Sequence, residues 1–152
     1  MFRVTKEIAF CFGHRLMNYD GKCRNLHGHN GRAVITVAGR ELDESGMVTD
    51  FAGMRKHIGD WIDRTLDHRM LLQRDDPLVP LLRGAGEQVV AMDEHPTTEN
   101  IAKFICDWVE SEGYAVVEVT MWETPSSYAT YQARGATRDP APPLRNGEGA
   151  GG

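Results

Sequence analysis

The chain has 152 residues, 41% of them hydrophobic, and a formal net charge of −5 at pH 7. This size suits one domain with its own core, the acidic balance is opposite to the basic surface of nucleic-acid binders, and no apolar run reaches the roughly 18 residues that span a membrane. The first residues lack the apolar centre of a signal peptide, and three cysteines, an odd number, argue against a disulfide framework. We therefore expect a cytoplasmic protein with neither a nucleic-acid nor a membrane partner.

The first forty residues predict two strands separated by a loop. Residues 2–14 alternate in polarity, which is typical of a half-buried strand, and His14 ends the run in register with an apolar face of Phe2, Val4, Ile8, Phe10 and Phe12. Turn-forming residues predict a loop over 15–28. A second strand is expected over 29–37, because apolar residues fall at alternate positions there.

The middle of the chain predicts one helix followed by irregular structure. Residues 51–66 have apolar residues at helical spacing, and Asp50 stands at the position of an N-cap. A short strand is predicted over 87–92. Between them, residues 67–86 are expected to be irregular, because any period is interrupted by Pro77, Pro80 and Gly84.

A second helix and a further strand follow. The helix begins after Pro96, is capped by Thr97 or Thr98, and ends at Gly113. Residues 114–123 are the expected last strand, with Val117, Val119 and Met121 on one face.

The resulting ββαβαβ pattern, with its potential for antiparallel hairpins, indicates an α+β domain. We expect this domain to cover residues 1–134. Residues 135–152 are rich in Gly and Pro and offer too little apolar surface to order themselves, so they are expected to form a disordered tail.

Three histidines carry the strongest chemical signal. His27 and His29 are separated by one residue, so an extended backbone points both side chains to the same face. His14, at the end of the first strand, is the predicted third ligand. Three neutral imidazoles with one open position are typical of a catalytic zinc site, and we expect these residues to bind Zn²⁺.

Cys23 lies four residues before His27, and its spacing is compatible with two roles. As a fourth ligand, its thiolate would close the zinc site and make it structural. As a free side chain near a dication, it would lose its proton more easily and could serve as a nucleophile or base. Spacing alone leaves both roles open.

Three further positions carry candidate polar side chains. Asp67 directly precedes His68, and an aspartate in this position can orient an imidazole and hold its charge, although such pairs are common by chance. Glu123 continues the apolar face of the last strand, so it is either exposed beyond the strand end or buried with a partner that offers N–H donors. Glu99 suits the positive end of the second helix dipole.

Six short motifs follow one another along roughly residues 1–132. They are Phe10-Cys11-Phe12-Gly13-His14-Arg15-Leu16, the Cys-x-x-x-His-Gly-His segment from Cys23 to His29, Asp50-Phe51, Leu66-Asp67-His68, Pro96-Thr97-Thr98-Glu99-Asn100 and Trp122-Glu123-Thr124. Each motif is weak alone. Together, in this order and at these intervals, they resemble the 6-pyruvoyl-tetrahydropterin synthase superfamily, and most closely its bacterial 6-carboxytetrahydropterin synthase branch.

The resemblance implies separate roles for the three histidines and for Cys23. His14, His27 and His29 match the zinc ligands of the family. Cys23 matches the catalytic cysteine, which implies that it is not a fourth ligand.

The resemblance also implies roles for the later candidates. Asp67 and His68 match the partners that complete the catalytic set. Glu123 matches the acid that anchors the pterin ring, and Thr98 and Glu99 lie in a segment that also contacts the pterin.

The implied fold is the tunnelling fold, an antiparallel sheet with two helices on one face. Subunits of this family join their sheets into a barrel, form active sites between subunits, and usually assemble as hexamers of two trimers. The implied reaction converts 7,8-dihydroneopterin triphosphate to 6-carboxytetrahydropterin, acetaldehyde and triphosphate, on the way to queuosine and related deazapurines. Arg15 or another cation is the expected ligand of the triphosphate.

Two departures from the family pattern bear on the product. The family usually has two small residues where this chain has Phe12-Gly13, and often Lys-Asn where this chain has Arg69-Met70. Both could reshape the pocket around the substrate side chain. A 6-pyruvoyl-tetrahydropterin synthase acting on the same substrate is therefore an alternative, and a non-catalytic zinc protein closed by Cys23 is the alternative of another class.

Overall fold

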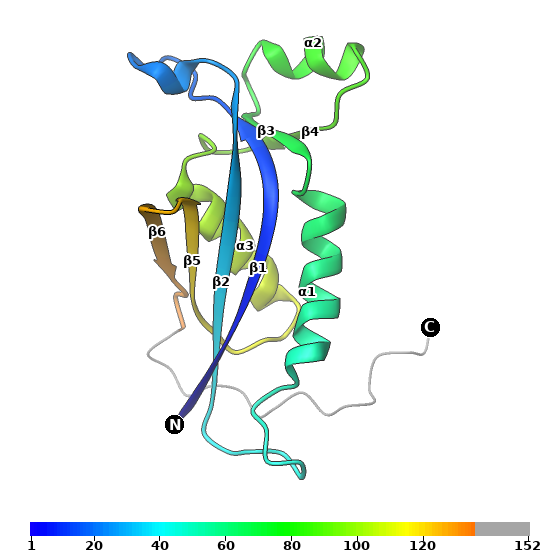
Figure 1. Ribbon diagram of the computed structural model, residues 1–152, viewed down its shortest axis with the longest axis vertical. Coiled ribbons are helices and arrows are strands. Elements are labelled where there is room, and N and C mark those ends of the chain that lie inside the picture. Colours follow the sequence, from blue (N-terminus) through cyan, green and yellow to red (C-terminus); the bar gives the residue numbers. More distant parts are fainter. Residues whose placement is uncertain (136–152) are drawn as a thin grey trace.

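A computed structural model describes residues 1–135 of the chain. The elements in chain order are β1 (Phe2–His14), the 3-10 turn η1 (Lys22–Arg24), β2 (His27–Gly39), α1 (Phe51–Thr65), β3 (Arg69–Gln73), α2 (Leu78–Gly84), β4 (Val89–Met92), α3 (Thr98–Ser111), β5 (Val116–Thr124) and β6 (Ser127–Gln132). A curled six-stranded sheet carries α1 and α3 against one side, and α2 lies at one end of the molecule beyond β3 and β4 (Figure 1).

The long β1–β2 hairpin is the centre of the sheet. The strand order is β4-β3-β1-β2-β5-β6, and β1 and β2 pair antiparallel along their whole length, from Phe2 opposite Gly39 to His14 opposite His27. On its other side β1 pairs with β3 only at residues 12–14, in parallel. The hairpin therefore brings the ends of the two histidine-bearing segments face to face.

The core lies between the sheet and the two long helices. Alternate residues of β1 and β2 face α1 and α3, as the sequence pattern predicts, and the fully buried side chains include Ile35, Met54, Ile58, Ile101 and Val119. The predicted caps are confirmed: Asp50 accepts hydrogen bonds from the first turn of α1, and Thr97 accepts one from the backbone N–H of Asn100 in α3. The α+β fold class is confirmed.

The expectation of irregular structure over residues 67–86 is wrong. This segment contains β3 and α2. Pro77 and Pro80 do not break α2, because they stand where backbone N–H groups have no partner inside a helix. Asp76 starts the helix by accepting a hydrogen bond from the backbone N–H of Leu78 at 2.8 Å.

Three other features differ from the sequence-based expectation. β2 begins at His27, two residues earlier than predicted, so both histidines of the pair lie inside the strand. β6 was not predicted, and it returns from β5 through a tight turn at residues 125–126. The sheet is not wholly antiparallel, because β3 and β4 run parallel to β1, and α2 adds a third helix to the two that were expected.

The predicted tail, residues 135–152, lies outside the described residues except for Gly135. Within the described range, no helix is both long and apolar enough to cross a membrane.

Candidate active site

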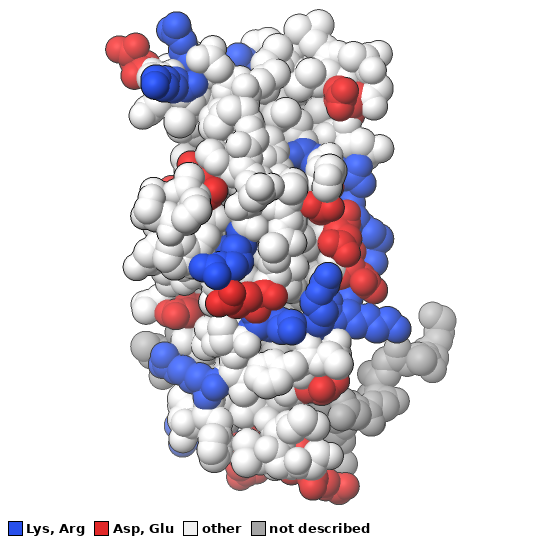
Figure 2. Space-filling model, in the orientation of Figure 1, with Lys and Arg blue, Asp and Glu red and all other residues white. Residues whose placement is uncertain are grey.

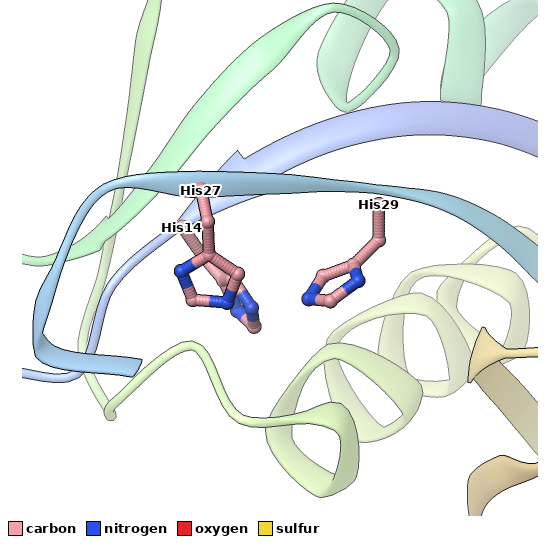
Figure 3. A group of neighbouring side chains, drawn as sticks. All are labelled: His14, His27 and His29. Carbon is pink, nitrogen blue, oxygen red and sulfur yellow. The ribbon is translucent and has the colours of Figure 1, made fainter. Parts of the chain in front are cut away.

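The fold brings three imidazoles together at one end of the β1–β2 hairpin. His14 and His27 are direct partners across the two strands, and His29 lies two residues further along the same face of β2. One ring nitrogen from each lies within 4.8 Å of the others, and the rings converge beside the start of α3 (Figure 3). The structure thus confirms that these residues form a group able to hold one metal ion.

Backbone carbonyls fix the orientation of two of these rings. Nδ1 of His14 donates to the carbonyl of Pro96 at 2.7 Å, and Nδ1 of His27 donates to the carbonyl of Asn25 at 2.7 Å. A proton on Nδ1 leaves Nε2 as the lone-pair nitrogen, which is the arrangement of metal-binding histidines.

Two ring nitrogens of the group make no hydrogen bond within residues 1–135. Nε2 of His14 and Nε2 of His29 are buried, and neither makes a hydrogen bond in the described part of the chain. Buried polar atoms in native structures are nearly always satisfied. A metal ion would satisfy both, so the residues fit the group that the resemblance implies.

Burial favours the neutral form of the His14 and His29 imidazoles. Burial lowers the pKa of His14 and of His29 below the usual value, although Glu123 pulls both pKa values in the opposite direction. A metal ligand must offer a lone pair rather than a proton. The depressed pKa values therefore favour metal binding at neutral pH.

Phe12, the first of the two departures from the family pattern, packs against the three-histidine group. The Phe12 ring lies 5.2 Å from the ring of His14 and 5.7 Å from that of His29, measured between centroids. At the neighbouring Gly13, an added Cβ would lie 2.6 Å from the terminal methyl of Met70. The two departures, Phe12-Gly13 and Arg69-Met70, are paired across β1 and β3 and line the same cavity.

Glu123 lies beside the metal group and is held by Thr98. Its Oε2 accepts a hydrogen bond from the Thr98 hydroxyl at 2.5 Å, and its Oε1 lies 3.4 Å from Nε2 of His29. The Glu123 side chain is 22% exposed, so this carboxylate is partly buried with one oxygen facing the imidazoles. Glu99, by contrast, is exposed in the first turn of α3.

Cys23 lies in the half-buried turn η1, between the two histidine-bearing strands. The turn is fixed to the end of β1, because the carbonyl of Cys23 accepts a hydrogen bond from the backbone N–H of Leu16 at 2.8 Å. The group of potential metal ligands contains the three histidines and does not include Cys23.

Asp67 is hydrogen-bonded both to the backbone of β1 and to the neighbouring His68. One Asp67 oxygen accepts the backbone N–H of Cys11 at 2.9 Å, and the other binds Nδ1 of His68 at 2.8 Å. Burial raises the pKa of Asp67, but these hydrogen bonds outweigh it and hold the pKa below its usual value. His68 has a φ of 55°, a left-handed conformation that is uncommon for residues other than glycine and is often found at functional sites.

An open cavity of about 520 Å³ is lined by residues of both the three-histidine group and the Asp67–His68 pair. Its walls include His27, His29, His68, Met70 and Gln88. No hydrogen bond or ion pair between residues 1 and 135 joins the Asp67–His68 pair to the three imidazoles.

Arg15 forms an ion pair with the buried carboxylate of Asp76. Its Nε and Nη2 donate to the two oxygens of Asp76 at 2.7 and 2.5 Å. The Asp76 side chain is fully buried, whereas that of Arg15 is 23% exposed.

Comparison with known protein families identifies the family to which the chain belongs. The family model described as 6-pyruvoyl tetrahydropterin synthase matches residues 3–134. The chain belongs to this family. The resemblance inferred from the six motifs is therefore confirmed, and the chain is an enzyme of the tetrahydropterin synthase type.

Similar proteins of this family carry the 6-carboxy name. A 6-carboxy-5,6,7,8-tetrahydropterin synthase of Rickettsia bellii is 32% identical over 135 residues, which cover 84% of this chain and 98% of that protein. One of Haemophilus influenzae is 31% identical over 141 residues, covering 87% of this chain and 99% of that protein.

Solved structures of the family share the fold. An uncharacterized protein from Wolinella succinogenes superposes with a TM-score of 0.74 at 29% identity, covering 86% of this chain and 97% of that one. The 6-pyruvoyl tetrahydropterin synthase of Caenorhabditis elegans gives a TM-score of 0.64 at 27% identity, covering 87% and 95%. The tunnelling fold of the subunit is therefore confirmed.

Several contributors to the site had no signal in the sequence. The carbonyls of Pro96 and Asn25 orient two imidazoles, and a backbone carbonyl leaves no trace in residue identity. Asp76 was overlooked because its segment was expected to be irregular. An aspartate just before Pro77 and an apolar run is a helix-start signal that could have revealed it.

Proposed function

We propose that this protein is a zinc-dependent 6-carboxy-5,6,7,8-tetrahydropterin synthase, which converts 7,8-dihydroneopterin triphosphate to 6-carboxytetrahydropterin, acetaldehyde and triphosphate. The observation that carries the proposal is the three-imidazole group with buried, unpartnered Nε2 atoms next to the Glu123–Thr98 pair. The names of the similar Rickettsia and Haemophilus proteins support the 6-carboxy product. A place in queuosine and deazapurine synthesis and a cytoplasmic location are predictions that go with this assignment.

The proposed roles follow from the chemistry of the side chains. Bound through His14, His27 and His29, Zn²⁺ would act as a Lewis acid on the side-chain hydroxyls of the substrate. Cys23 is proposed to move one proton as a thiolate, and His68 another.

Substrate orientation is assigned to other residues. Asp67 orients the His68 imidazole. Glu123 accepts the adjacent N–H donors of the pterin ring, and Thr98 and Glu99 are proposed to contact the pterin from the start of α3. The prediction that Arg15 binds the triphosphate stays a prediction, and its pairing with Asp76 reduces the charge it can offer.

The proposed homohexamer, a dimer of trimers with active sites between subunits, is supported by open strand edges on the subunit. In the described chain β6 pairs only with β5, and β1 before Phe12 pairs only with β2. Unpaired edges are templates for pairing with another chain. Because the two edges differ, their contact is head-to-tail, and such contacts form a ring when the rotation between subunits closes.

The test is incubation of the purified protein with 7,8-dihydroneopterin triphosphate, followed by mass analysis. We expect 6-carboxytetrahydropterin and acetaldehyde. A product that retains the side chain would identify the 6-pyruvoyl alternative instead. The absence of any pterin product would contradict the proposed function.

The Cys23→Ala variant separates the enzyme from the non-catalytic zinc protein. We expect the variant to keep its zinc and its fold while losing most turnover. Loss of metal together with unfolding would show that the thiolate is a fourth ligand, because removing a ligand from a closed site removes folding energy.

A further inference from the structure

Four arginines line one groove of this acidic protein. The groove has a volume of about 500 Å³ and lies among the end of α1, β3, α2 and β4. Its arginines come from four separate elements or loops, Arg64, Arg69, Arg74 and Arg83. Figure 2 shows Lys and Arg side chains gathered near the upper end of α1, where the chain leads into β3. Such a concentration is unexpected in a chain with a net charge of −5.

Three of these arginines are not neutralised within the described fold. Only Arg74 pairs with a carboxylate, that of Asp93. Arg69 donates to the carbonyl of Arg64 at 3.1 Å, and Arg83 donates to the carbonyl of Val89 at 3.2 Å. These backbone contacts hold the guanidinium groups in place without cancelling their charge.

Helix electrostatics explains only part of the cluster. Arg64 lies in the last turn of α1, where a cation interacts favourably with the helix dipole, and Arg69 binds a carbonyl of the same turn. Arg74 and Arg83 come from elsewhere in the sequence and do not interact with that helix end. Arg83 lies in the last turn of α2, where the dipole of that helix also favours a cation, but no single helix end accounts for the convergence of all four arginines on one groove.

The groove is a neighbour of the candidate active site. It shares Arg69 and Gln88 as walls with the cavity that contains His27, His29 and His68. A ligand seated in this cavity beside His68 could therefore extend a tail past Arg69 into the groove. Guanidinium groups match phosphate oxygens in geometry and charge.

We propose that this arginine groove binds the triphosphate tail of the substrate, so that the cations which recognise the tail are Arg64, Arg69 and Arg83 rather than Arg15. The inference rests on the proposed function for the identity of the ligand. The chemistry itself requires only a polyphosphate chain, and binding of such a chain can be measured without turnover.

The first experiment titrates inorganic tripolyphosphate into the full-length protein by calorimetry. We expect Arg64→Gln and Arg83→Gln each to weaken binding by about tenfold, because each removes a charge-assisted contact. The matched control is Arg55→Gln, which removes the same charge from an exposed position of α1 outside the groove. Equal affinity of all variants, or an equal loss in the control, would overturn the proposal.

The second experiment separates the tail from the pterin. We expect the KM for 7,8-dihydroneopterin triphosphate to rise about tenfold in both groove variants, while the affinity for unphosphorylated 7,8-dihydroneopterin stays unchanged. Loss of affinity for both ligands would show that the groove acts on the pterin site or on folding. If the protein shows arginine-dependent tripolyphosphate binding but no pterin chemistry, the proposed function fails and the polyphosphate site stands.

Discussion

At the scale of single residues, the ring nitrogens of His14, His27 and His29 are arranged to bind a metal ion. His14 and His27 each use Nδ1 to bind a backbone carbonyl, which fixes both the tautomer and the angle of the ring. Nε2 of His14 and of His29 is buried without a partner. This arrangement costs stability in the free protein, because each unpaired buried nitrogen carries a desolvation penalty.

The first prediction concerns these ligands. Purified His27→Ala and His29→Ala should each lose most of their metal, because two imidazoles cannot replace a three-ligand site. The matched control is His95→Ala, an exposed histidine outside the group. Metal content per subunit is measured by atomic emission on protein purified with zinc. Stoichiometric zinc in both ligand variants would contradict the assignment.

The second prediction concerns Glu123. In Glu123→Gln one acceptor oxygen becomes an N–H donor that faces an N–H of the pterin, and such an unpaired buried group costs about 1–3 kcal/mol. Pterin affinity measured by fluorescence titration should fall about tenfold or more, while zinc content stays unchanged.

The control for this change lies on the same strand. Glu118→Gln makes the same substitution on the opposite face of β5, and it should bind the pterin as the parent does. If Glu123→Gln also binds with parental affinity, Glu123 is not the anchor of the ring.

At the scale of elements, the segment between α1 and β4 is tied to the end of β1 by one ion pair. Arg15 follows β1, and Asp76 precedes α2, 61 residues later. Asp76 also accepts the backbone N–H of Leu78 at the start of α2. The same carboxylate therefore starts the helix that carries Arg83 and fixes it against the site.

The third prediction concerns the pH dependence of this tie. The guanidinium of Arg15 lowers the pKa of Asp76 below its usual value, and burial opposes that shift without reversing it. A carboxyl with a depressed folded-state pKa adds stability above its unfolded pKa of about 3.9, and the contribution is lost as the pH falls through the folded value.

Asp76→Asn should therefore lower the free energy of unfolding at pH 7 by about 3 kcal/mol, because it leaves a partly buried cation without its partner. The difference from the parent should shrink as the pH falls below about 4. Urea unfolding of the metal-free protein measures the difference in unfolding free energy at pH 7 and its change with pH. Asp75→Asn, a change at the exposed neighbour, is the control. A pH-independent difference would show that the ion pair is not its source.

At the scale of the whole molecule, the candidate chemistry is divided between two groups. The imidazoles and Glu123 lie at the helix-covered face of the sheet, whereas Asp67 is anchored on the backbone of Cys11 in β1. His27, His29 and His68 line one cavity, but no hydrogen bond or ion pair among the described residues joins the two groups. If active sites form between subunits, one chain supplies the metal group and Cys23, and its neighbour supplies His68.

The fourth prediction tests this division by mixing two inactive variants. Cys23→Ala and His68→Ala each lack one proton-transfer group, so each alone should lose most turnover. Subunits mixed at equal amounts and reassembled after dissociation should regain about a quarter of the parental activity, because about one site in four then receives both intact residues. No recovery, in mixtures shown by mass spectrometry to be heteromeric, would place both residues in the same subunit's site.

The sequence by itself determined most of the secondary structure and the identity of the metal group. Alternation in β1 and helical spacing in α1 and α3 are local patterns, because each reflects which face of one element meets the core. The spacing of His27 and His29 needed only the two-residue period of a strand, and the order of six motifs was enough to indicate the family. None of this required long-range information.

Only the tertiary structure decided what lies beside what. The unpredicted strand β3 is short and depends on β1, a partner distant in the sequence. The carbonyl of Pro96 that orients His14 is 82 residues away, and the arginine groove gathers residues from 64 to 83 that have no common period. Hydrogen bonds and charge clusters of this kind arise from chain folding in three dimensions, so residue spacing carries no record of them.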